Sequence, residues 1–301
     1  MVRDARLALR PVDRLVLAYV VFATIVVVSR GALVTTGTVW LVALYVLAAA
    51  LILLGARVAP DRPFGNLVYD FYPLLLVGPL YAALGTLNAR VGAARILTHD
   101  RIVQTWEYAI FRGQPAYELI RRYPSTVASG LFHFAYFSYY AILIGGPVLL
   151  ALAGRRAAAR RVLLAMMLAF VVCYIPFTLW PVAGPYFAFP HPSGPVRQVW
   201  SARLVYASLA RGSSIGTAFP SSHVAVTTAV TLSVWSASRR LGAVFAVCAV
   251  LLTLGVVYCQ MHYAIDATVG LAIGIGAWAV AGVWSRRGTE RIAGHGVTSG
   301  V

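Results

Sequence analysis

The stretch GTAFPSSHVAVTTAVTLSVWSA, residues 216–237, joins a polar opening to an apolar run. Pro220, Ser221, Ser222 and His223 stand at its head, and the residues that follow are mostly apolar or small. About 20 such residues are enough to cross a bilayer as a helix. The stretch therefore predicts a membrane helix over 218–237 whose amino-terminal end carries a serine pair and a histidine.

The composition of the whole chain also indicates a membrane protein. Of its 301 residues, 60% are hydrophobic and 11% are charged, whereas a soluble domain carries about 25% charged residues. The net charge is +16, and all 25 basic residues are arginines, which occur in short clusters between apolar runs. Such clusters fit anionic lipid and membrane topology better than nucleic acid. The three cysteines form no CxxC pair and are interpreted as small apolar side chains. We expect no cleavable signal peptide.

We predict an all-α, polytopic membrane bundle of about eight transmembrane helices in one integral membrane domain. Residues 1–60 are expected to form two accessory helices, 61–287 a six-helix core and 288–301 a flexible tail. The expected spans are Leu15–Val34, Val39–Leu54, Leu67–Leu87, Val127–Ala153, Val162–Val182, Ala218–Ala237, Leu241–Tyr258 and Tyr263–Trp284.

The arginines also predict an orientation. With a cytoplasmic N-terminus, 15 of the 25 arginines fall in inside segments, which include Arg3 and Arg6, and ten fall outside. Because cytoplasmic loops are enriched in basic residues, we expect both termini inside and 216–223 on the extracytoplasmic side of the plasma membrane. Six of the ten outside arginines lie in the loop 88–125, where 101–111 predicts an interfacial helix anchored by Trp106. Its apolar face would comprise Ile102, Val103, Trp106 and Ile110.

Ionisable residues at membrane depth are costly and often functional. In YCQMHYAIDATVG, residues 258–270, His262 and Asp266 stand four positions apart and share a helical face. Asp266 is expected to accept a hydrogen bond from one ring nitrogen of His262, which leaves a lone pair on the other. Asp70 also falls in a span, and its role could be either a buried hydrogen bond or catalytic chemistry. His133, in LFHFAYFSYY, fits either a core or a substrate pocket.

One span separates the two motifs, so both of their helices should begin at the same membrane face. Two positive helix ends would then converge on one anion, flanked by two imidazoles. One imidazole can attack phosphorus while the other protonates a leaving oxygen. The residues expected to bind the substrate are Ser221, Ser222, Gly216, Arg211, Arg203, Arg197 and His133. No cofactor is expected, and no metal site, because no third ligand has a suitable spacing.

FPSSH (219–223) and HYAID (262–266) resemble motifs of the type-2 phosphatidic acid phosphatase superfamily. The stretches WEYAIFRGQP and FHFAYFSYY are similar to bacterial members of its inositol phosphorylceramide synthase and sphingomyelin synthase branch. This similarity implies that the plasma membrane is a bacterial one. The resemblance implies that His262 is the nucleophile that forms a phosphohistidine, that Asp266 orients it, and that His223 is the acid–base residue. The family's phosphatases also have Lys-x6-Arg-Pro and Ser-Arg-x5-His. This chain has no lysine, and Gly255 and Val256 stand at the Ser-Arg positions.

Three functions follow as hypotheses. The first is a phosphotransferase that moves a phosphoryl head group from a phospholipid donor to a lipid alcohol acceptor. The second is a lipid phosphatase with water as the acceptor. The third is a lipid transporter or membrane scaffold without catalysis, which would have no need of two facing imidazoles. The two missing cations favour a singly charged phosphodiester over a phosphomonoester, and therefore favour the first hypothesis.

Overall fold

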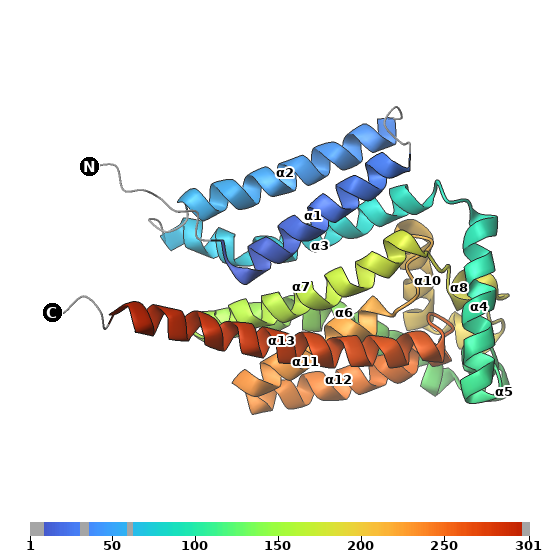
Figure 1. Ribbon diagram of the computed structural model, residues 1–301. Helices are drawn as coiled ribbons and strands as arrows, with labels where there is room; N and C mark the ends of the chain where they lie inside the picture. Colours follow the sequence, from blue (N-terminus) through green and yellow to red (C-terminus); the bar gives the residue numbers. More distant parts are fainter. Residues whose placement is uncertain (1–8, 31–35, 59–62, 297–301) are drawn as a thin grey trace.

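A computed structural model describes residues 9–30, 36–58 and 63–296 and is helical almost throughout (Figure 1). Its helices are α1 (Pro11–Ser29), α2 (Thr36–Val58), α3 (Pro63–Asn88), α4 (Ala93–Phe111), α5 (Pro115–Arg122), α6 (Thr126–Leu152), α7 (Arg156–Leu179), α8 (Pro185–Ala188), α9 (Pro195–Gln198), α10 (Trp200–Gly212), α11 (Ser222–Ala237), α12 (Arg239–Tyr258) and α13 (Ala264–Gly296). Within these ranges no strand forms, and Val182 and Thr217 make a single parallel backbone pairing. The prediction of an all-α membrane bundle is confirmed.

Seven of the described helices are long and apolar enough to span a membrane, which makes the chain an integral membrane protein. The eighth predicted span, over 218–237, is shorter than expected because α11 begins only at Ser222. Its 16 residues rise about 24 Å, less than the ~30 Å of a hydrocarbon core. α11 is instead surrounded by α6, α7, α12 and α13. Residues 31–34, the end of the predicted first span, lie outside the described residues, as do Arg3 and Arg6.

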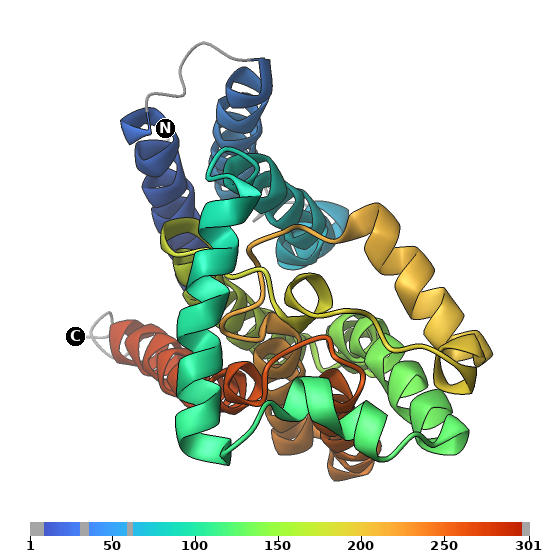
Figure 2. The same ribbon diagram turned by 90° about the vertical axis from the view of Figure 1, so that its right-hand side faces the viewer.

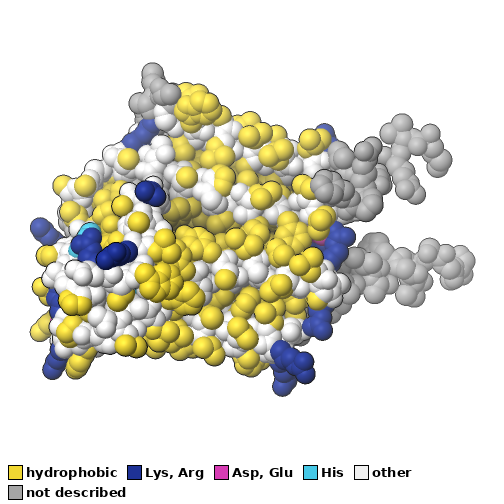
Figure 3. Space-filling model, turned by 180° about the vertical axis from the view of Figure 1, so that it is seen from behind, with side chains coloured by type: hydrophobic (Ala, Val, Ile, Leu, Met, Phe, Trp, Pro, Cys, Tyr) yellow, Lys and Arg dark blue, Asp and Glu magenta, His cyan; other side chains and the backbone are white. Residues whose placement is uncertain are grey.

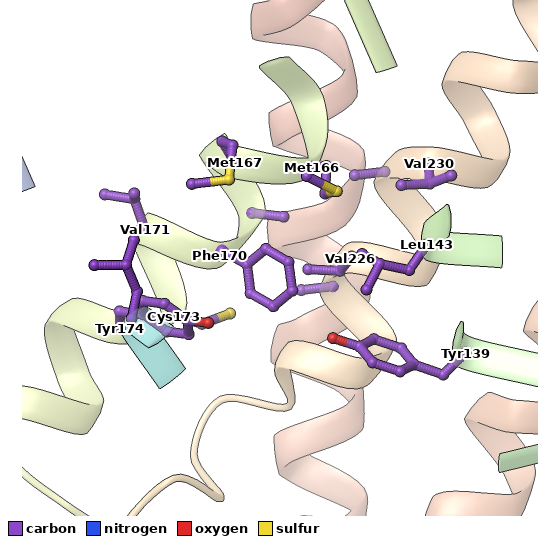
Figure 4. Packing of buried hydrophobic residues seen from close by; sticks show 14 of the residues in the cluster. Tyr139, Leu143, Met166, Met167, Phe170, Val171, Cys173, Tyr174, Val226 and Val230 are labelled. Carbon is purple, nitrogen blue, oxygen red and sulfur yellow. The ribbon is translucent and has the colours of Figure 1, made fainter. Parts of the chain in front are cut away.

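The core of the bundle is built around α7, which is the most buried of the spanning helices. Side chains of α6, α7 and α11 meet around Phe170, with Leu143 and Val226 beside it (Figure 4). Gly146 of α6 allows this approach, because a Cβ there would lie 2.7 Å from Val230. The bundle is therefore held by close packing of apolar side chains, as lipid-embedded helices require.

The outer surface of the bundle is apolar between two charged ends. Large hydrophobic side chains such as Trp40, Leu75 and Val247 are exposed along the helices. In the view of Figure 3 they form a broad middle zone, and arginines gather at both ends. The start of α1 and the end of α13 lie at one end of the bundle, and α4 lies at the other (Figure 1). This arrangement agrees with the predicted topology, although which end faces the cytoplasm stays a prediction.

An ion network at the terminal end holds α1 and α3 against α7. Asp70 of α3 pairs with Arg10 at 3.0 Å, with Arg156 at 2.8 Å and with Arg160 at 2.9 Å. Asp13, buried in the first turn of α1, pairs with Arg10 at 3.1 Å. Of the two roles considered for Asp70, the structure therefore shows the buried polar contact. The division into accessory helices, core and tail stays a prediction, since α13 extends to Gly296 and 297–301 lie outside the described residues.

The loop predicted at 88–125 forms α4 and α5, and α4 lies across the end of the bundle (Figures 1 and 2). Ile102, Trp106 and Ile110 are exposed, as an interfacial helix requires, but Val103 is fully buried on the opposite face. The predicted apolar face was therefore wrong at Val103. The buried face of α4 instead comprises Ile96, Asp100, Val103 and Glu107.

Candidate active site

The FPSSH motif ends in the open amino terminus of α11. Ser221 is the N-cap, and its hydroxyl accepts the amide of Val224 at 3.3 Å while its carbonyl accepts the amide of Ala225 at 3.0 Å. The two preceding amides, of Ser222 and His223, have no carbonyl one turn earlier within the helix. Both residues line a cavity of about 40 Å³ together with His262. The positive end of α11 therefore faces this cavity.

The loop that carries His262 is set by the end of α12. Gln260 adopts a left-handed conformation with φ of 61°, and the amides of Met261 and His262 both donate to the Val256 carbonyl at 2.9 Å. The Gln260 side chain is held by Arg121, which donates to it at 2.7 Å, and it donates to the Pro190 carbonyl at 3.0 Å. The turn reverses the chain, so that His262 lies beside α11.

The His262 ring is fixed by a backbone carbonyl. Its Nδ1 donates to Ala218 at 3.0 Å, which leaves a lone pair on Nε2. The expected hydrogen bond to Asp266 is replaced by a looser contact of 3.5 Å, because Asp266 Oδ2 accepts the Tyr263 amide at 2.9 Å. Burial lowers the pKa of His262 to about 4, so its neutral form dominates at neutral pH.

His223 faces His262 across the cavity. Its Nδ1 lies 3.5 Å from His262 Nε2, and its Nε2 shares a hydrogen bond of 3.0 Å with the Tyr136 hydroxyl. The ring of Tyr139 packs beside it, with centroids 4.6 Å apart. A phosphoryl group cannot fit between two nitrogens 3.5 Å apart, so the rings must separate when a substrate binds between them.

The other predicted substrate residues lie in different places. Ser222 lines the cavity, whereas Ser221 is buried as the cap of α11. Gly216 has φ of +89°, and a Cβ there would lie 2.6 Å from the Pro181 side chain. Its backbone conformation and close packing therefore account for a glycine at this position. His133 is buried in α6, where Nδ1 donates to the Ser129 carbonyl at 2.8 Å, and it does not line the cavity.

The three predicted arginines stand further out. Arg197, Arg203 and Arg211 are exposed, and none of them lines the cavity. The guanidinium of Arg197 lies over the ring of Tyr206, 4.5 Å from its centroid. Their role in substrate binding stays a prediction.

Two buried carboxylates of α4 hold the loops that form the site. Asp100 accepts the amides of Ala183 at 2.8 Å and Gly184 at 2.7 Å, and the Tyr263 hydroxyl at 3.0 Å. The neighbouring Val182 carbonyl accepts the amide of Ala218, the residue whose own carbonyl holds His262. A chain of contacts therefore runs from Asp100 of α4 through Val182 and Ala218 to the His262 ring.

Glu107 binds the first turn of α13. Its two oxygens accept the amides of Ala264 at 3.1 Å and Ile265 at 3.0 Å. The prediction that two helix ends converge on one anion is therefore wrong for α13, whose leading amides already have partners. Burial raises the pKa of both carboxyl groups, of Asp100 and of Glu107. Sequence reasoning placed both in a loop, although Ile96, Asp100, Val103 and Glu107 follow one another at spacings of four, three and four residues, which marks one helical face.

An apolar cavity of about 580 Å³ adjoins the site between α3, α6, α7 and α10. Its lining includes Leu75, Phe137, Leu143 and Tyr174. It shares its inner end, at Tyr81, Tyr136, Leu209, Ser213, Ser222 and His223, with the smaller cavity. A volume of this size holds a small ligand, and here its apolar wall leads directly to an imidazole.

Comparison with known proteins identifies the family. A family model described as the PAP2 superfamily matches residues 110–280, which is more than half of the chain and includes both histidine motifs. Searches of curated proteins and of solved structures returned no match. Asp100 and Glu107 lie just before the matched region. The chain belongs to the PAP2 superfamily, and this places it among lipid phosphatase-type and phosphotransferase-type enzymes.

Proposed function

We propose that the protein is a membrane lipid phosphotransferase that moves a phosphoryl head group from a phospholipid to a lipid alcohol through a phosphohistidine on His262. The observation that carries the proposal is the charge of the site. Among the described residues that line the catalytic cavity, none is an arginine and none is a carboxylate. The fixed positive charge at the cavity is that of the α11 amino terminus, equivalent to roughly half an elementary charge.

This charge suits a singly charged phosphate better than a doubly charged one. A buried anion needs nearby compensation, and a phosphomonoester approaches −2 near neutral pH, whereas a phosphodiester carries −1. The Ser-Arg positions of the phosphatases offer no cation here. Val256 is fully buried, and a side chain at Gly255 would begin 3.0 Å from the Phe132 carbonyl. Both positions are therefore used to pack α12 against α6 and supply no cation for a phosphate.

The adjoining cavities support a lipid substrate. The apolar wall of the 580 Å³ cavity fits an alkyl chain, and a lipid bound there with its head group at the inner end would bring that group to His223. Tyr136 and Tyr139 flank the same imidazole. Their rings help to keep water from the phosphoryl group until an alcohol arrives.

The proposed reaction has two steps. The Nε2 lone pair of His262 attacks phosphorus, and the P–O bond to the diacylglycerol-like alcohol breaks. His223, whose protonated form is favoured by the anionic phosphate beside it, gives its proton to the departing oxygen. Neutral His223 then takes the proton of the acceptor hydroxyl, whose oxygen attacks phosphorus as the P–N bond breaks. Asp266, 3.5 Å from Nδ1, stabilises the positive charge that develops on the His262 ring. Both histidines return to their starting states.

The test is a competition in nanodiscs between labelled phosphatidic acid and a panel of labelled phosphodiester lipids, each with and without a ceramide-like or diacylglycerol acceptor. We expect a new phosphodiester lipid that depends on the acceptor and little free phosphate. Rapid acceptor-independent release of phosphate from phosphatidic acid, with no new lipid, would show a phosphatase instead. A His262→Ala variant is the blank in both arms.

A further inference from the structure

A second polar cavity lies outside the catalytic site, at the same end of the bundle. It has a volume of about 390 Å³ and shares no lining residue with the catalytic cavity. Its walls come from the end of α1, the connection between α3 and α4, the first turns of α4 and the end of α7. The lining residues are Arg30, Arg90, Val91, Arg95, His99, Leu179, Trp180 and Pro181. Three of them, Leu179, Trp180 and Pro181, lie within the family match of 110–280, and the other five lie before it.

The cavity has a strong excess of positive charge. Three of its eight lining residues are arginines, and no carboxylate is among the described residues that line it. The nearest acidic residue in the sequence, Asp100, is buried and holds the Ala183 and Gly184 amides instead. The segment 31–35 that follows Arg30 lies outside the described residues, and its sequence, GALVT, has no acidic side chain.

Arg30 and His99 are held in place by backbone carbonyls, and Arg30 is repelled by Arg95. Arg30 donates to the Thr178 carbonyl at 2.5 Å. His99 donates from Nδ1 to the Pro181 carbonyl at 2.7 Å, and its ring packs against Trp180 with centroids 5.0 Å apart. Burial and the nearby Arg95 lower the pKa of Arg30. Burial and mutual repulsion make it unfavourable to gather these arginines in one cavity. An anion bound among them would offset that cost.

The surroundings indicate the depth at which that anion lies. The ring of Trp180 also packs against Trp106, whose centroid is 5.6 Å away and which is exposed on α4 beside Ile102. Tryptophans of this kind mark the level of lipid head groups in a membrane. A phosphate is the anionic group found at that level in a bilayer, and guanidinium groups bind it with paired hydrogen bonds.

We propose that this arginine cavity binds the phosphate group of an anionic membrane lipid, separately from the catalytic site. A lipid held there also braces the segment 179–181. This segment leads into the loop that Asp100 holds, and Pro181 packs against Gly216 of the catalytic motif. The cavity therefore provides a route by which the lipid composition of the membrane affects the catalytic loops.

The experiment measures lipid binding in the absence of turnover, on the purified full-length His262→Ala protein in detergent. Native mass spectrometry scores retention of phosphatidylglycerol against phosphatidylcholine. We expect phosphatidylglycerol to bind at least tenfold more tightly, and Arg30→Ala/Arg95→Ala to remove that preference. Arg95→Ala alone, which keeps the Arg30–Thr178 bond, should weaken binding at least threefold. Arg101→Ala, an exposed arginine of the same helix, is the matched control and should bind as the parent does.

Two results would overturn the proposal. One is equal retention of the two lipids, or a preference that survives Arg30→Ala/Arg95→Ala in protein with unchanged circular dichroism. The other is complete displacement of phosphatidylglycerol by millimolar inorganic phosphate, which would identify a site for the free ion. Because no catalysis is measured, a phosphatase result in the nanodisc assay leaves this test intact.

Discussion

Replacement of Glu107 tests whether α4 positions the catalytic loop. Glu107→Ala removes the carboxylate that accepts the Ala264 and Ile265 amides, at 3.1 Å and 3.0 Å. These amides begin the helix that directly follows the His262 loop. Without the carboxylate they are left at a closely packed helix end with no acceptor, and the first turn of α13 is free to shift. We expect a loss of both stability and turnover.

The magnitude follows from the two bonds. A buried donor that loses its partner costs about 1–3 kcal/mol, so two donors cost about 3 kcal/mol in Glu107→Ala. At roughly 2–4 °C per kcal/mol for a domain of this size, the melting temperature should fall by about 6–12 °C. Glu107→Gln keeps one carbonyl acceptor and should lose about half as much. A displacement of about 1 Å at the nucleophile can cost ~100-fold in rate, so kcat of Glu107→Ala should fall by 10- to 100-fold with KM little changed.

The assay combines a thermal melt in detergent with kcat and KM for a phosphodiester lipid, measured well below the melting temperature. The rate at which labelled phosphohistidine appears on His262 provides a reading that instability alone does not change. Glu118→Gln is the matched control, because Glu118 is exposed and accepts a single amide, of Gln114, at 2.7 Å. A Glu107→Ala protein with normal kcat and normal phosphohistidine formation would refute a positioning role, whatever its melting temperature.

Further predictions concern the catalytic residues and the lipid cavity. His262→Ala and His223→Ala should each lower kcat at least ~100-fold, and Asp266→Asn less; acid-labile label on the wild type but not on His262→Ala checks the assignment, and a fully active His262→Ala rejects it. Because burial lowers the pKa of His262 to about 4, its neutral form is lost only as pH falls through 4, so the acid limb of kcat/KM should lie near 4; a limb at 6.5 contradicts this. The same shift makes the free energy of unfolding depend on pH. It is highest above pH 6.5 and falls by about 3 kcal/mol as pH drops towards 4, because the unfolded state binds the proton first. His262→Gln should therefore melt with a flatter pH dependence. Gly78→Leu, which projects into the apolar cavity, should raise KM for long-chain lipids, whereas Gly276→Leu, also in open space but outside that cavity, should not; equal effects would refute the lipid assignment.

Most of the fold was predictable because a bilayer imposes length and polarity on each span. Seven predicted spans match long apolar helices, with ends that differ by a few residues. The exception, α11, has no separate polar face, because other helices enclose it, and the polar residues before it form a cap rather than another helical turn. Hydropathy cannot distinguish a helix enclosed by protein from one that faces lipid.

The pairing of His223 with His262 was predictable for a different reason. An imidazole is costly at membrane depth, so His223 and His262 stood out in a chain with six histidines. Their contact, with Nδ1 and Nε2 3.5 Å apart, followed from the topology of alternate spans. The partner of His262 could not be predicted, because the Ala218 carbonyl belongs to a turn whose shape depends on its pairing with 182. Backbone acceptors leave no signature in a sequence.

The buried carboxylates of α4 show how the charge of the site and its architecture are linked. Glu107 satisfies the leading amides of α13 and thereby cancels the positive end of that helix. No carboxylate lines the cavity at the leading amides of α11. The cavity therefore has one uncompensated helix end, whereas the topology alone suggested two. With no arginine in its lining, that end is the main fixed positive charge near the phosphorus position. The contact of Glu107 with α13 therefore also limits the positive charge at the site, which supports the phosphodiester substrate of the proposed reaction.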